Sequence, residues 1–110
     1  MATSEQTLTG LQHLTTLYEQ GHRSPAVDLA VEKLVTLERE RAQHETAELD
    51  QKLKAFEEQY HMTSEDFYRQ FRAGELGDEI DSVEWSIFYE MRAAAKQRLM
   101  VLESRAAYDA

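Results

Sequence analysis

Several residue types and patterns are scarce in this chain of 110 residues. It has no cysteine, which excludes a disulfide framework, a thiolate nucleophile and a Cys-ligated metal site. It has one proline and four glycines, which disfavours a β-rich fold with many turns. No apolar run approaches the roughly 20 residues that cross a bilayer, and the start lacks the basic and apolar regions of a signal peptide. We expect a single cytoplasmic domain with one hydrophobic core.

Positive charge is also scarce. Lysine and arginine number 12 against 21 aspartates and glutamates, which gives a formal net charge of −9. Such a field repels polyanions, so nucleic acid and anionic membranes are disfavoured as direct partners. A basic protein is attracted instead. The charge therefore favours an acidic adaptor or inhibitor over a DNA-binding protein, and we find no helix-turn-helix with a basic recognition helix.

The residues that are abundant favour helix throughout, and we predict an all-α fold. Residues that start helices precede each predicted segment. They are Thr3 or Ser4, Ser24 with Pro25, Thr63 with Asp66 in a capping box, and Asp81 with Glu84 in a second one. Gly21 and Gly74 are placed to end helices in the left-handed conformation. We predict an N-terminal helix over 1–23, a long helix over 24–61, a short helix over 63–74 and a C-terminal long helix over 81–107.

The long predicted helix is apolar at both ends and polar in its middle. The apolar positions are Val27, Val31, Leu34 and Val35 near the start, and Leu49, Leu53, Phe56 and Tyr60 near the end. Between Glu38 and Glu48 only Ala42 and Ala47 can enter a core. This stretch is expected to be solvated, to contact a slender partner, or to break. We expect the two long helices to form an antiparallel hairpin, assembled as a coiled-coil-like oligomer. The first helix would pack on one end of it or on a second chain.

Two Glu-x-x-His pairs have the spacing by which di-iron bundles present ligands on one helical face. They are Glu19 with His22 and Glu58 with His61. Both pairs lie at helix ends, so neither is held inward on a regular turn. A structural role, with His61 meeting the dipole at a helix C-terminus, is the favoured interpretation.

Other catalytic patterns are weak. His44 begins a segment like a zinc-protease helix, but Glu48 stands where the second histidine should be. Gly74 and Gly77 lie among acidic residues that would repel a phosphate. No strand-turn-helix elbow exists to expose a nucleophile. We expect no enzyme activity, no cofactor and no metal.

Most aromatic residues fall between Phe56 and Tyr89, and Phe67, Phe71 and Phe88 are the expected core. Trp85 and Tyr89 lie one turn apart at the edge of the last apolar stripe, where they are either buried or binding anchors for a partner. The neighbouring acidic loop is either solvated or suited to a basic protein. The candidate partner-binding residues are Glu75, Asp78, Asp81, Trp85 and Tyr89.

The C-terminal half carries a specific pattern of aromatic, capping and acidic residues. Its positions are Phe56, Tyr60, Met62, Thr63, Ser64, Glu65, Phe67, Phe71, Gly74, Glu75, Leu76, Gly77, Asp78, Glu84 and Trp85. In this pattern the chain resembles a family of small acidic bacterial and archaeal proteins associated with toxin–antitoxin gene pairs. It departs from them at His61, where similar sequences usually have glycine.

The resemblance implies an antitoxin-like protein that binds and masks a small toxin, commonly a basic ribonuclease. From the long helix with its narrow apolar stripe we expect self-association as a dimer or tetramer, with the toxin contacting the acidic loop and the aromatic edge. Two alternatives remain open. One is a self-assembling helical scaffold with no toxin partner, and the other is a helical protein that binds metal through carboxylates and histidine.

Overall fold

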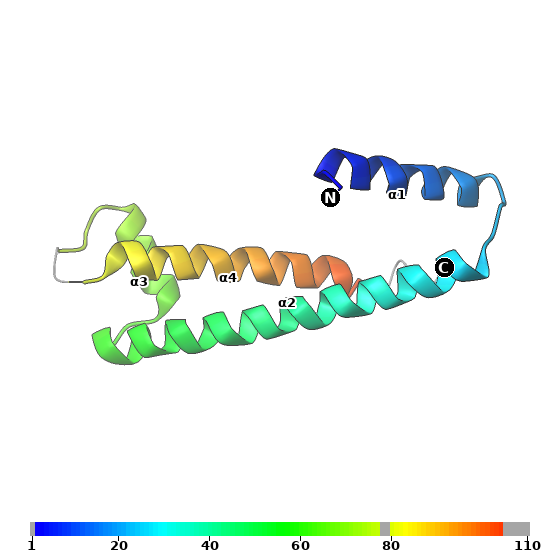
Figure 1. Cartoon of the computed structure of the whole chain (residues 1–110). Helices are drawn as coiled ribbons and strands as arrows, with labels where there is room; N and C mark the ends of the chain where they lie inside the picture. The colour runs from blue at the N-terminus through cyan, green and yellow to red at the C-terminus, as the bar shows by residue number, and fades with distance from the viewer. Residues whose placement is uncertain (1, 78–79, 105–110) are drawn as a thin grey trace. The chain divides into compact units, whose positions relative to one another are not determined.

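The computed structural model describes residues 2–77 and 80–104. These residues form four helices and no strand, so the all-α prediction is confirmed (Figure 1). The helices are α1 (Ser4–Glu19), α2 (Pro25–Tyr60), α3 (Ser64–Arg72) and α4 (Ser82–Leu102). Within the described part of the chain, no helix has the length and apolar character needed to cross a membrane.

Each helix lies within the range predicted for it, but α4 ends earlier than 107. It stops at Leu102, where the N–H of Glu103 bonds to the carbonyl of Leu99; residues 105–107 lie outside the described part. The long helix α2 runs unbroken through its polar middle. No glycine or proline interrupts that stretch. The 3.2 Å pair between His44 and Glu48 lies one turn apart on its surface, as in stable solvated helices.

The capping predictions hold fully at α1, hold in part at α3 and fail at α4. Thr3 and Gln6 form a complete capping box on α1. Thr63 accepts the N–H of Asp66 at 3.1 Å, but the Asp66 carboxylate pairs with Arg69 instead of reaching back. Asp81 occupies the N-cap of α4 and its side chain accepts no cap hydrogen bond. The predicted box of Asp81 with Glu84 is therefore wrong, and the Asp81 carboxylate is left for other contacts.

Three residues end helices or turns with positive φ. Gly21 (φ 89°) and Gly74 (φ 71°) do so after α1 and α3, as the sequence predicts. The third is His61, which follows α2 with φ 54°. A histidine therefore adopts a backbone conformation that costs a side-chain-bearing residue energy and costs glycine little.

The chain divides into two compact units, Met1–Val35 and Thr36–Ala110. In the N-terminal unit, α1 has no buried residue. The Tyr18 hydroxyl links the end of α1 to the start of α2. It donates to the Asp28 carboxylate at 2.7 Å and lies 2.9 Å from the carbonyl of Ser24.

In the C-terminal unit, α4 runs antiparallel to the second part of α2 (Figure 1). Arg98 pairs with Glu45, and Arg92 pairs with Asp50. The residue number therefore rises along one helix as it falls along the other. This unit forms the antiparallel hairpin predicted from the sequence.

The core of the C-terminal unit joins three helices. Leu53 of α2, Phe67 of α3 and Trp85 of α4 are almost completely buried and form one cluster. The rings of Trp85 and Phe67 are nearly parallel, with centroids 3.9 Å apart. Further aromatic and aliphatic side chains surround this cluster, namely Phe56, Tyr60, Met62, Tyr68, Phe71, Leu76, Ile80, Phe88 and Tyr89.

Candidate partner-binding site

The two aromatic residues singled out in the sequence have different environments. Trp85 has no exposed surface, so of the two environments that the sequence left open for it, the structure has the buried one. The reason is that α3 covers it, since Phe67 stacks on its ring and Ser64 accepts its indole N–H. Tyr89 is half-buried, with its ring 4.6 Å from that of Tyr68. Only Tyr89 of this pair offers surface to a partner.

The acidic residues singled out in the sequence lie in and after the loop between α3 and α4. Glu75 and Asp81 are exposed, whereas Asp78 lies outside the described residues. The Asp81 carboxylate is 3.5 Å from the Tyr60 hydroxyl, a distance at the outer limit of a hydrogen bond. Asp81 is therefore a weakly engaged carboxylate at the start of α4.

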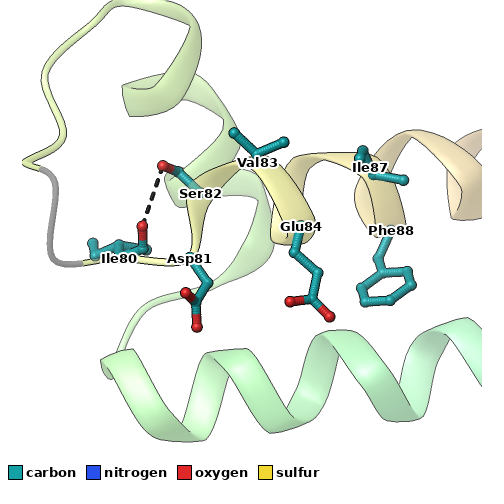
Figure 2. A pocket seen from close by; sticks show the side chains of 7 residues that line it. All are labelled: Ile80, Asp81, Ser82, Val83, Glu84, Ile87 and Phe88. Carbon is teal, nitrogen blue, oxygen red and sulfur yellow. Dashed lines mark hydrogen bonds between the residues drawn. The ribbon is translucent and has the colours of Figure 1, made fainter.

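A hollow of about 620 Å³ lies at this end of α4 (Figure 2). Its lining combines two acidic residues with aliphatic and aromatic ones, namely Ile80, Asp81, Ser82, Val83, Glu84, Ile87 and Phe88. Figure 2 shows Asp81, Glu84 and Phe88 on one side of the helix and Val83 and Ile87 on the other. A ligand here would meet negative charge and apolar surface together.

The apolar part of this lining is accessible. Val83 is 67% exposed and Ile87 is 49% exposed. They are one turn apart on α4, so they form a continuous apolar strip on the side of the helix away from Asp81 and Glu84. The structure thus brings Asp81 together with Glu84, Val83 and Ile87.

The sequence did not identify Glu84, Val83 and Ile87 as site residues. A signal was present, because Val83, Ile87 and Met91 recur at four-residue steps. The same stripe contains Phe88, which packs on the core. Periodicity alone does not separate a buried stripe from an exposed one when the two adjoin.

Tyr68 and Tyr89 lie near the site, and each contacts a charged side chain. The Tyr68 hydroxyl bonds to Glu90 at 2.7 Å, and this hydrogen bond is the main reason that the pKa of Tyr68 is raised above its ordinary value of 10.0. The Arg92 guanidinium lies 5.6 Å from the ring centre of Tyr89. Tyr68 and Tyr89 therefore form a fixed aromatic surface on the α3 side of α4.

In the described part of the chain, no three His, Asp or Glu side chains lie close enough together to hold a metal ion. Comparison of the chain with protein-family models, with curated proteins and with solved structures finds no match. The likeness to antitoxins therefore rests on the residues quoted for it above.

Proposed function

We propose that this chain is a non-enzymatic, antitoxin-like protein that binds and masks a small basic protein. The observation that carries the proposal is the hollow at the start of α4, where two carboxylates adjoin exposed aliphatic side chains. The proposed contact residues are Glu75, Asp81, Glu84, Val83, Ile87 and Tyr89. Trp85 supports the site from the core.

A lysine or arginine side chain fits this combination. Such side chains lay their aliphatic stems on apolar surface while the charged head reaches polar surroundings. The stem would pack on Phe88 and the head would meet the Asp81 and Glu84 carboxylates, which lie on the same side of α4. Val83 and Ile87, on the other side of the helix, would contact apolar side chains of the partner. Because the Asp81 side chain caps no helix, pairing with a cation would break no cap.

The charge of the whole chain supports the same partner. A net charge of −9 attracts a basic protein over distance and speeds its encounter. Most of the excess lies in the C-terminal unit, where residues 36–110 contain 17 acidic and 10 basic residues. We place the complex in the cytoplasm, in keeping with a chain that has no cysteine.

Co-purification with the product of the adjacent gene tests the proposal. Tagged chain is expressed with its neighbour, the mass of the complex is determined, and the neighbour is also expressed alone. We expect a small basic protein to co-elute and to arrest growth only when this chain is missing. A harmless neighbour, with the chain eluting alone as a homo-oligomer, would contradict the proposal and favour the scaffold alternative.

Charge-neutralising variants locate the contact. Asp81→Asn and Glu84→Gln each remove one charge from the hollow with little change in shape, and we expect each to weaken binding about tenfold. The matched control is Glu40→Gln, which removes one charge from an exposed position on α2. Equal losses in all three variants would place the binding site elsewhere and leave only a general charge effect. Binding should also weaken as salt is raised.

A further inference from the structure

The N-terminal unit has enough apolar side chains for a folded helical hairpin, but it has no hydrophobic core. Among residues 2–35 no side chain is buried. Large aliphatic side chains of both helices are instead between 41% and 67% exposed, namely Leu8, Leu11, Leu17, Leu29, Val31 and Leu34. Within this unit, helix α1 makes no close backbone contact with α2. Within this unit, both apolar faces are uncovered.

A unit of this size needs something more to be stable. Domains below about 40 residues usually depend on disulfides, a metal or oligomerisation. The chain has no cysteine, and the described residues contain no cluster suited to a metal ion. Helix α1 has 16 residues, near the length at which an isolated helix in water is only marginal. Association with another polypeptide is the remaining source of stability.

We propose that a second copy of this chain covers the N-terminal unit, so that two copies pack α1 and the first turns of α2 into a four-helix bundle. The faces suit this arrangement because apolar residues recur at helical spacing on each, as Leu8, Leu11 and Leu14 on α1 and as Val27, Val31 and Leu34 at the start of α2. Helix α1 has 16 residues and the segment 25–35 adds 11, and the residues on their apolar faces would form an interface at the small end of the range of specific interfaces. A two-fold axis would place the same patch of each copy against the other.

Charge favours a second copy over a basic protein at this surface. Residues 1–35 contain four acidic and two basic residues, so two copies repel each other little. The same near-neutrality gives a basic protein little attraction here, whereas residues 36–110 are strongly acidic. The inference is therefore independent of the proposed function, and the dimer would carry two acidic hollows.

Sedimentation equilibrium of the full chain without any partner tests the dimer. We expect the wild type to have twice the mass of one chain. Leu11→Lys on α1 and Leu34→Lys on α2 should each raise the dimer dissociation constant roughly 30-fold or more. The matched control is Thr9→Lys, which adds the same charge at an exposed position on the polar side of α1 and should leave the dimer unchanged.

Two further variants distinguish loss of the proposed dimer contact from loss of helix and from a dimer formed through another face. Leu11→Ala shortens the side chain while raising helix propensity, so weaker association there cannot come from loss of helix. Ile87→Lys alters the exposed outer face of α4. The fluorescence of buried Trp85 reports whether the C-terminal unit stays folded in each variant. A monomeric wild type at about 100 μM, well above the micromolar range of specific association, would overturn the proposal. So would a dimer that Ile87→Lys dissociates and Leu11→Lys does not.

Discussion

The indole N–H of Trp85 donates a hydrogen bond to the Ser64 hydroxyl at 3.0 Å, and neither residue has any exposed surface. This bond joins the first turn of α4 to the first turn of α3. The Ser64 backbone N–H donates in turn to the Glu57 carboxylate of α2 at 2.8 Å. Ser64 is thus a polar junction of all three helices within the aromatic core.

Replacing Ser64 should destabilise the C-terminal unit. Ser64→Ala leaves the buried indole N–H without an acceptor, and the expected loss is about 1–3 kcal/mol in the free energy of unfolding. Urea unfolding followed by fluorescence measures it, because Trp85 is the only tryptophan. The control is Ser86→Ala, since the Ser86 hydroxyl donates only to the carbonyl of Val83 in its own helix. Its expected effect is below about 0.5 kcal/mol. Equal losses in both variants would mean that the bond to Trp85 contributes nothing specific.

Arg92 of α4 ties together the other two helices of the C-terminal unit. Its guanidinium pairs with Asp50 of α2 at 3.2 Å and with Glu65 of α3 at 3.1 Å, while its side chain is only 16% exposed. Desolvation lowers the Arg92 pKa, but the hydrogen bonds that Arg92 donates to the two carboxylates, together with their negative charge, outweigh it and the net pKa is raised. We expect Arg92→Met to cost about 1–3 kcal/mol of stability, less than a fully buried pair because both carboxylates are partly solvated.

A second arginine provides the comparison. Arg69 pairs with Asp66 at 2.8 Å within α3, and both side chains are largely exposed. Arg69→Met should cost no more than about 0.5 kcal/mol. The difference between the two variants in urea midpoint is the measured quantity. If Arg69→Met were the more damaging, the link between helices through Arg92 would be refuted.

The left-handed conformation of His61 leads to a stabilising variant. His61→Gly relieves a backbone strain of about 1–2 kcal/mol and loses part of it to the greater entropy of glycine in the unfolded chain. We expect a net gain of up to about 1 kcal/mol in thermal or urea unfolding.

Gly74→Ala, which replaces a glycine by a residue with a side chain, should have the opposite effect on stability. Gly74 has φ 71°, and a Cβ added there would meet no atom within 4 Å. Gly74→Ala should therefore destabilise by about 1 kcal/mol through backbone conformation and not through a clash. A stabilising Gly74→Ala, or a strongly destabilising His61→Gly, would show that these turns are held by contacts of the side chains instead.

Tyr18 and Tyr68 should lose their phenolic protons at a higher pH than an ordinary tyrosine. A hydrogen bond to Asp28 is the main cause that raises the pKa of Tyr18, and one to Glu90 does the same for Tyr68. Their folded-state pKa values exceed the unfolded value, so the stability they contribute is present below pH 10 and is lost as pH rises through the raised values. Absorbance titration of the phenolates measures this. Asp28→Asn and Glu90→Gln should each return one tyrosine to the ordinary range, and an unchanged titration in both would disprove the assignment.

The helices were predictable because their signals are local. Thr3, Ser24 and Thr63 accept hydrogen bonds from amides of the next turn, and Gly21 and Gly74 act through their own φ, so each works without knowledge of distant residues. The continuity of α2 across its polar middle is also local, because nothing there prevents helical hydrogen bonds. The C-terminal end of α4 was missed, since no glycine or proline marks it.

The candidate site was only partly predictable. The acidic character near Asp81 was visible in the sequence, whereas its meeting with Val83 and Ile87 depends on which face of α4 packs on α2 and α3. Trp85 shows the same limit, because its spacing fitted an edge and a core equally well. Only the position of α3 decides that Trp85 is covered and Ile87 is not.

By itself, then, the sequence determined the helical class, most helix boundaries and the acidic surface, all of which follow from side-chain propensity, caps and charge. The tertiary structure decided which apolar residues enter a core. Trp85 and Phe67 are buried because three helices meet around them, whereas Leu11 and Leu34, equally apolar in sequence, stay exposed. Burial depends on what a neighbouring helix covers, and that is a property of the packing that no single helix carries.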